Sequence, residues 1–146
     1  MRGNVTFRST VPVNLDKHPP GEELAEYLAE KMTAGGLKTR VFDNYEDFAW
    51  WIESEAERRM PWALLGYVND GPAEWLIQIN SSVGWLGRLL GRSDKEGCRL
   101  FTERLQTMLT SDPQFSDVRW HVGEWSDSGW SSDPAEPDAA GDRGGR

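Results

Sequence analysis

The chain is poor in the residues that most often bind transition metals. Its 146 residues include one cysteine, Cys98, and two histidines, His18 and His121. A single cysteine forms no intramolecular disulfide and cannot build a cysteine-based zinc site. Neither histidine has a second histidine or cysteine at ligand spacing. We therefore expect no metal site and no cofactor. A catalytic Cys98–His121 pair would need a third, orienting group that the sequence does not reveal.

Long hydrophobic runs are also absent. No stretch approaches the roughly 20 apolar residues of a membrane-spanning helix. The first ten residues, MRGNVTFRST, lack the apolar run of a signal peptide. The segment GWLGRLLGRS at 84–93 is rich in glycine, but it lacks the lysine of a phosphate-binding loop and the spacing of a dinucleotide-binding turn. These absences predict a cytoplasmic protein that does not bind a membrane.

Positive charge is scarce as well. The chain has 16 lysines and arginines against 24 acidic residues, which gives a formal net charge of −8. An acidic surface repels the phosphate backbone of nucleic acids. The densest basic clusters, Arg58-Arg59 and Arg88 to Arg92, are too small to reverse this repulsion. Nucleic acid is therefore not an expected partner.

The composition changes near residue 126. From there the sequence SDSGWSSDPAEPDAAGDRGGR consists mainly of serine, aspartate, proline, glycine and alanine, with one aromatic residue. Such a segment cannot bury enough apolar surface to offset the entropy lost on ordering. We expect a single domain over residues 1–125 and a disordered acidic tail over residues 126–146.

Periodicity within residues 1–125 predicts six strands and two helices. Apolar residues recur at helical spacing over 21–34, and Ser93 to Glu96 fit a capping box that begins a second helix, ended by Asp112-Pro113. Strands are expected at 5–13, 37–43, 47–53, 60–68, 74–80 and 117–122. The order β-α-β-β-β-β-α-β predicts a two-layer α+β sandwich, with both helices on one face of a mostly antiparallel sheet.

Alternation along the predicted strands separates two faces. In the strand at 47–53, Phe48 and Trp50 share one face, and Trp51 lies on the other. Each strand has one nearly pure apolar face, which we expect to pack against the helices. The predicted core aromatics are Phe48, Trp50, Trp75 and Trp120.

Glu46 and Asp47 stand directly before this strand. Adjacent strand residues point to opposite faces, so the two acids do not form a converging acid/base pair. Glu46 shares the parity of Phe48 and Trp50, and we expect it at the rim of the helical layer, accepting hydrogen bonds from backbone N–H groups. A functional role for Glu46 remains the alternative.

Arg88, Arg92 and Ser93 form a weak candidate anion site. They precede the second predicted helix, whose free N–H groups attract anions. Asp94 and Glu96 already balance the positive end of this helix. A capped helix is therefore the preferred interpretation.

One sequence pattern spans several of these elements. It consists of Pro-Gly, then Leu-Ala and a leucine, then a glycine, then an acidic-aromatic motif, at Pro20, Gly21, Leu24, Ala25, Leu28, Gly36, Glu46, Asp47, Phe48, Ala49 and Trp50. It resembles a family of small, uncharacterised bacterial proteins in which the last motif reads Glu-Asp-Trp-Gly-Trp. This chain departs from the family at Phe48 and Ala49. EWLIQI at 74–79 and DVRW at 117–120 extend the resemblance over most of residues 5–122. It implies one compact domain and no transferable activity.

The favoured hypothesis is a non-catalytic protein-interaction module of the regulatory or immunity type, because no catalytic constellation is present. The sheet face opposite the helices is expected to be exposed, aromatic and able to bind another protein or a second copy. Alternatively, this face lies under residues 83–92. The predicted contact residues are Trp51, Leu65, Tyr67, Leu76, Arg119 and His121. The other hypothesis is a small hydrolase or ligand-binding enzyme that uses Glu46 or Asp47 with His121.

Overall fold

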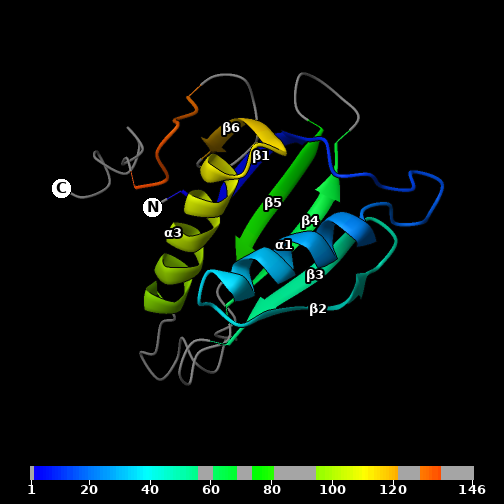
Figure 1. The fold of residues 1–146 in the computed structure, drawn as a ribbon, viewed down its shortest axis with the longest axis horizontal. Coiled ribbons are helices and arrows are strands. Elements are labelled where there is room, and N and C mark those ends of the chain that lie inside the picture. The colour runs from blue at the N-terminus through cyan, green and yellow to red at the C-terminus, as the bar shows by residue number, and fades with distance from the viewer. Residues whose placement is uncertain (1, 56–60, 69–73, 81–94, 122–128, 136–146) are drawn as a thin grey trace.

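The described residues form one antiparallel sheet with two helices packed on the same face (Figure 1). The computed structural model describes residues 2–55, 61–68, 74–80, 95–121 and 129–135. The elements are β1 (Asn4–Ser9), α1 (Glu22–Ala34), β2 (Thr39–Tyr45), β3 (Ala49–Ser54), β4 (Trp62–Tyr67), β5 (Trp75–Asn80), α3 (Lys95–Ser111) and β6 (Phe115–His121). The predicted α+β fold and its element order are confirmed. Ser93 and Asp94 of the predicted capping box lie outside the described residues.

The strand order across the sheet is β2-β3-β4-β5-β1-β6. Strands β2 to β5 form a meander in which each strand pairs with the next one along the chain. The first strand, β1, then pairs with both β5 and β6. This order leaves β2 and β6 at opposite edges of the sheet.

Helix α1 begins and ends at glycines. Gly21 precedes it with a φ of 110°, a conformation that favours glycine, and its carbonyl accepts the first helical hydrogen bond from Ala25 N at 2.8 Å. Glu22 and Glu23 then place negative charge in the first turn, where it complements the helix dipole. Gly35 follows the last turn.

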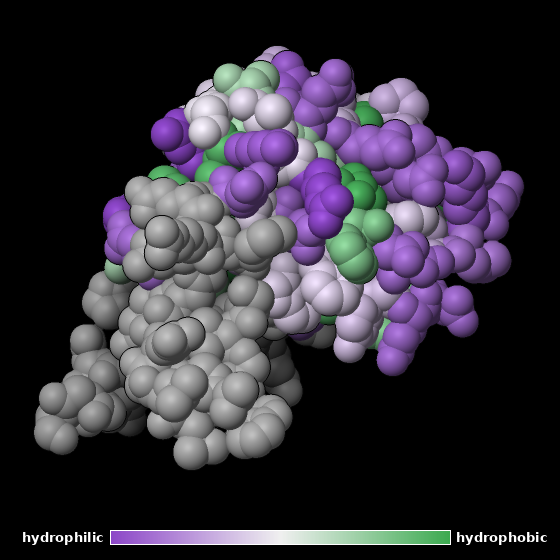
Figure 2. Space-filling model, turned by 90° about the horizontal axis from the view of Figure 1, so that it is seen from below, coloured by the Kyte–Doolittle hydropathy of each residue, from purple (hydrophilic) through white to green (hydrophobic). Residues whose placement is uncertain are grey.

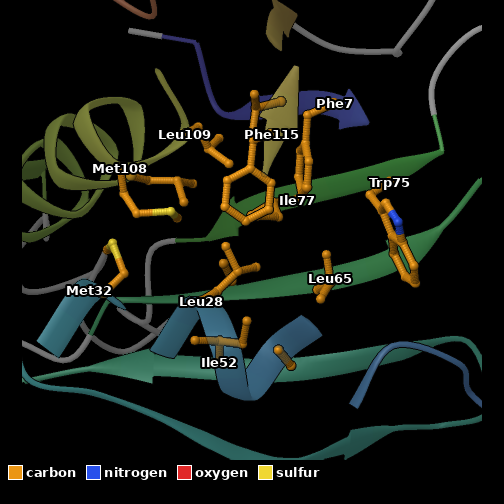
Figure 3. Close-up of a cluster of buried hydrophobic side chains, with 14 of the residues drawn as sticks. Phe7, Leu28, Met32, Ile52, Leu65, Trp75, Ile77, Met108, Leu109 and Phe115 are labelled. Atoms are coloured by element: carbon orange, nitrogen blue, oxygen red, sulfur yellow. The ribbon is translucent and has the colours of Figure 1, made fainter. Parts of the chain in front are cut away.

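The core lies between this helical layer and one face of the sheet. Leu28 and Met32 of α1 and Met108 and Leu109 of α3 point toward sheet residues that include Ile52, Leu65 and Ile77 (Figure 3). Phe7 and Phe115 add an edge-to-face ring contact, with centroids 5.6 Å apart. Trp75 and Trp120 are buried, and Trp50 packs against the same core. Core positions for these three tryptophans are therefore confirmed.

Phe48 is not a core residue, and this prediction is wrong. Strand β3 begins at Ala49, so Phe48 and the two preceding acids lie in the turn that joins β2 to β3. Strand alternation does not apply there. The side chain of Phe48 is 56% exposed. Glu46 is also exposed, with a φ of 53°, and no hydrogen bond to its carboxylate is found among the described residues. The expected rim contact of Glu46 is therefore absent from the described part of the chain.

Residues 129–135, which belong to the segment predicted to be a disordered tail, form hydrogen bonds with the domain. Ser131 forms two backbone hydrogen bonds with Trp120 of β6, at 2.7 and 2.9 Å. Arg2 donates from its backbone to Pro134 O and from its guanidinium to Gly129 O, at 2.9 and 2.7 Å. Polar groups, most of them in the backbone, make these contacts, and apolar composition alone could not reveal them.

Gly21 allows a direct test of the contact between the start of α1 and the core. A Cβ at this position would lie 2.7 Å from a ring carbon of Trp75, at a φ that side chains rarely adopt. We expect Gly21→Ala to lower the free energy of unfolding by about 2–4 kcal/mol, through overpacking and backbone strain. Urea unfolding measures this change.

The matched control is Gly35→Ala at the other end of the helix. There φ is −79°, and an added Cβ would meet its nearest neighbours at 3.4 and 3.5 Å. This variant should unfold with nearly the wild-type free energy. Equal losses in the two variants would contradict the importance of the Gly21–Trp75 contact.

Candidate functional site

Five aromatic side chains gather where β2, β3 and β4 adjoin, and we name this group the aromatic patch. Ring centroids are separated by 5.0 Å for Phe42–Trp51, 4.7 Å for Trp51–Trp62, 6.3 Å for Tyr45–Trp51 and 5.6 Å for Tyr45–Phe48. Phe42 and Phe48 are 51% and 56% exposed, whereas Tyr45, Trp51 and Trp62 are half-buried. The patch is therefore continuous, with its two phenylalanines exposed to solvent.

Strand register places the centre of the patch on the face opposite the helices. Trp50 pairs with Leu65, which is fully buried in the core, so both face the helical layer. The next pair, Trp51 with Leu64, must face the other way. Trp62 stands diagonal to Trp51 on the neighbouring strand and shares its face.

A β-bulge in β2 adds Phe42 to the patch. Val41 pairs with Ile52 and Asp43 pairs with Trp51, so Phe42 is an extra residue in the ladder. Val41 packs against the core, while the ring of Phe42 contacts Trp51. The bulge therefore places both Phe42 and Asp43 beside Trp51.

Charged residues flank the patch at both ends, as cation–carboxylate pairs at one end and as acids at the other. Arg40 lies over the ring of Phe42, 5.4 Å from its centroid, and its Nε donates to Glu53 at 2.8 Å. Lys38 pairs with Glu55 at 3.4 Å. At the other end, Asp43, Glu46 and Asp47 are exposed, and none of these three forms an ion pair within the described ranges. Seen from the β2 side, the described surface is mostly hydrophilic, with a few small apolar areas (Figure 2).

The indole nitrogen of Trp51 is a buried donor at the centre of the patch. Its Nε1 is inaccessible to solvent and has no hydrogen-bond partner among the residues described. Such a group costs about 1–3 kcal/mol relative to a satisfied donor. The ring is therefore held in place by its neighbours and not by a hydrogen bond of its own.

Leu65 and Tyr67 do not lie on the face predicted for them. Both are on the helix-facing side of β4, where Leu65 is buried and Tyr67 pairs with Trp75. The sequence WALLGY has apolar residues at both parities, so its alternation does not identify the core face.

Leu76, Arg119 and His121 are opposite the helices, as predicted, but they are remote from the aromatic patch. Leu76 and His121 are 7% and 3% exposed, so the expectation of an open face is wrong at these positions. His121 Nε2 lies 2.8 Å from Thr6 Oγ1. Arg119 donates to Asp117 and stacks over Trp130. Of the six predicted contact residues, only Trp51 belongs to the patch.

The sequence analysis missed Phe42, Tyr45 and Trp62 as members of the site. The available signal was the concentration of aromatic residues between Phe42 and Trp51. A β-bulge brings Phe42 beside Trp51, and a diagonal contact between neighbouring strands brings Trp62 beside it. Neither arrangement produces a periodic pattern in the sequence.

The proposed acid–histidine catalytic pair is not assembled. Glu46 and Asp47 join β2 to β3, and His121 ends β6 at the opposite edge of the sheet. Five strand spacings separate those edges, which corresponds to about 24 Å. Neither acid can exchange a proton directly with His121 across that distance.

Other types of site find little support in the described residues. No group of three or more His, Cys, Asp or Glu side chains there could hold a metal ion. None of the described helices has the length and apolar composition needed to cross a bilayer. Arg88, Arg92 and Ser93, the candidate anion site, lie outside the described residues, as does the segment 83–92 named as a possible cover of the sheet.

A cleft of about 340 Å³ separates the C-terminal turns of α1 and α3. Its polar groups are engaged within the protein: Arg104 Nη1 donates to Gly35 O at 2.6 Å, and Tyr27 Oη donates to Asp112 Oδ2 at 2.7 Å. Partial burial of Asp112 opposes its ionisation. Hydrogen bonds from Tyr27 and Gln114 and the charge of Lys31 outweigh that effect, so the pKa of Asp112 lies below its ordinary value. These contacts give the cleft a structural role.

Comparison of the chain with protein-family models, with curated proteins and with solved structures found no match. The resemblance drawn from the Pro-Gly and Glu-Asp motifs therefore stays a prediction.

The carboxyl group of Asp112 gives a test of the cleft. Tyr27→Phe removes a hydrogen bond to the ionised carboxylate, so we expect the pKa of Asp112 to rise. A depressed pKa contributes stability above the unfolded pKa of about 3.9, and this contribution disappears as pH falls through the folded value. The variant should therefore be less stable at neutral pH, and the deficit should shrink at acid pH.

Carbon NMR titration of Asp112, with urea unfolding at several pH values, measures both effects. Tyr45→Phe is the control, because this tyrosine lies in the aromatic patch and should leave the pKa of Asp112 unchanged. An unaltered pKa in Tyr27→Phe would contradict the assignment.

Proposed function

We propose that this protein is a cytoplasmic, non-catalytic protein-binding module whose contact surface is the aromatic patch. The observation that carries the proposal is the exposure of Phe42 and Phe48, at 51% and 56%, in continuous ring contact with three further aromatics. Single exposed apolar residues are ordinary on protein surfaces, but contiguous ones mark interaction sites. The single cysteine of the chain fits a reducing compartment.

The packing of the aromatic patch on paired strands favours specific binding. Trp51 of β3 and Trp62 of β4 lie on two hydrogen-bonded strands, and the ring of Phe42 packs against that of Trp51. Aromatic side chains supply a large contact area at a small cost in rotamer entropy. A surface held in one geometry before binding also avoids the cost of ordering during association.

The charges around the patch favour a protein partner over a nucleic acid. One basic residue on β2, Arg40, is already paired with Glu53, and three acidic residues stand free of ion pairs in the described part of the chain. The net charge of −8 adds a long-range repulsion of phosphate groups. A protein surface with apolar and cationic groups complements this arrangement.

The double variant Phe42→Ser with Phe48→Ser tests the proposal. Loss of central aromatic contacts commonly costs at least 2 kcal/mol of binding free energy, or about 30-fold in affinity. We expect affinity capture from the native host to retrieve specific proteins with the wild-type chain, and the yield of these proteins to fall at least tenfold with the variant. Quantitative mass spectrometry measures the yields.

Leu15→Ser is the matched control, because Leu15 is also 51% exposed but lies outside the patch. This control should retain the captured proteins. Circular dichroism should show that all three chains are folded, since the substituted side chains are on the surface. Undiminished capture by the folded double variant would rule out the patch as the contact surface.

A further inference from the structure

We propose that the aromatic patch binds an arginine side chain of its protein partner, at the turn that runs from Tyr45 to Phe48. The partner's guanidinium group stacks on the exposed ring of Phe48 and pairs with the carboxylates of Glu46 and Asp47. This inference rests on the proposed function and names the chemical group that the contact surface recognises.

Unpaired carboxylates lie beside the rings of the patch. Asp43 pairs in register with Trp51 at the centre of the patch, and Glu46 and Asp47 directly precede Phe48 in the turn. All three acids are exposed, and none of them forms an ion pair within the described ranges. Charge complementarity therefore favours a cationic group on the partner.

The two exposed phenylalanines are not equally open to a cation. Arg40 lies 5.4 Å from the ring centroid of Phe42, and its Nε donates to Glu53 at 2.8 Å. A second cation over this ring would be repelled by Arg40. Phe48 is 56% exposed, and none of the cation–ring contacts found among the described residues involves it. A cation from a partner therefore binds at the Phe48 end.

The ring of Phe48 is held in place for such a contact. It meets the ring of Tyr45 edge to face, with centroids 5.6 Å apart and an angle of 81° between the planes. Tyr45 in turn contacts Trp51, with centroids 6.3 Å apart. The face of an aromatic ring carries the negative part of its quadrupole and attracts a cation. Ring and carboxylates thus favour the same kind of ligand.

Arginine fits this combination better than lysine. Its guanidinium is planar, so it can stack on a ring while it pairs with a carboxylate, and it is less strongly hydrated than an ammonium group. Besides Arg40, Arg119 has this arrangement: it lies 4.7 Å from the ring centroid of Trp130, and its Nε donates to Asp117 at 3.0 Å. The turn at 45–48 has a ring and carboxylates but no cation within the described part of the chain, so the partner supplies the guanidinium.

The turn allows its charge to be removed without harm to the fold. Glu46 has a φ of 53°, in the left-handed region that asparagine adopts more readily than glutamate. Asp47 is exposed and has nearly the same shape as asparagine. The double variant Glu46→Asn with Asp47→Asn should therefore fold like the wild-type chain.

NMR titration of the full chain with synthetic peptides tests the inference. The peptides share one glycine–serine sequence and carry arginine, lysine or citrulline at the same positions; citrulline resembles arginine in shape but has no charge. We expect the arginine peptide to shift the amide signals of residues 42–48, with a dissociation constant between about 0.1 and 10 mM. The lysine peptide should bind more weakly, and the citrulline peptide at least about tenfold more weakly.

Variants separate the two parts of the site. Glu46→Asn with Asp47→Asn should weaken binding of the arginine peptide about fivefold, as expected for two exposed ion pairs. Phe48→Leu keeps an apolar side chain but removes the ring, and should weaken binding about threefold. Glu26→Gln with Glu30→Gln is the matched control, because it removes the same charge from exposed positions of α1. This control should bind the arginine peptide like the wild-type chain.

Three results would overturn the inference: a citrulline or lysine peptide that binds as tightly as the arginine peptide, signal shifts that lie outside residues 42–48, or equal losses in the turn variant and the α1 control. Affinity capture distinguishes this failure from failure of the proposed function. Loss of the captured proteins with Phe42→Ser and Phe48→Ser, but not with the Asn variant of the turn, would leave the proposed function standing without arginine recognition. Undiminished capture by both variants would reject the proposed function itself.

Discussion

The pairing of Trp50 with Leu65 fixes the orientation of every side chain in β3 and β4. It turns Trp50 toward the helices and therefore turns Trp51 away from them. Because side chains alternate along a strand, a slip of one residue would exchange the two tryptophans. The buried face would then lose its apolar contacts with α1, and the aromatic patch would lose its centre. Core stability and surface chemistry thus depend on one register.

Much of the fold could be predicted from the sequence, because its signals are local. The spacing of Leu24, Leu28 and Met32 predicts α1, and glycines mark both of its ends. Alternation places Trp75 and Trp120 in the core. The prediction of buried faces failed where alternation gives no information. Phe48 lies in a turn, where strand alternation does not apply, and β4 has apolar residues on both faces. Composition also gave no sign that residues 129–135 form backbone hydrogen bonds with Trp120 and Arg2.

The candidate site could be predicted only in part. The position of Trp51 in its strand correctly predicted that it faces away from the helices. Leu65 and Tyr67 were predicted on the same face, but they face the helices, because the pairing of β4 with its neighbours is not specified by the sequence. Phe42 joins the site through a bulge, and Trp62 through a diagonal contact across β3 and β4. Tertiary pairing also separates His121 from Glu46 and Asp47 by the width of the sheet. The acid–histidine catalytic hypothesis therefore lacks the short distance that proton transfer requires.

The central claim is that the exposed face of the aromatic patch is a contact surface between protein chains. Hydroxyl-radical footprinting of the full chain, alone and mixed with the proteins that it captures, tests it most directly, with Leu15 and Tyr67 as exposed references outside the patch. The account predicts that modification of Phe42, Tyr45 and Phe48 falls when the captured proteins are added, while both references keep their reactivity. Constant modification of the patch residues, or protection of Tyr67 instead, would contradict it.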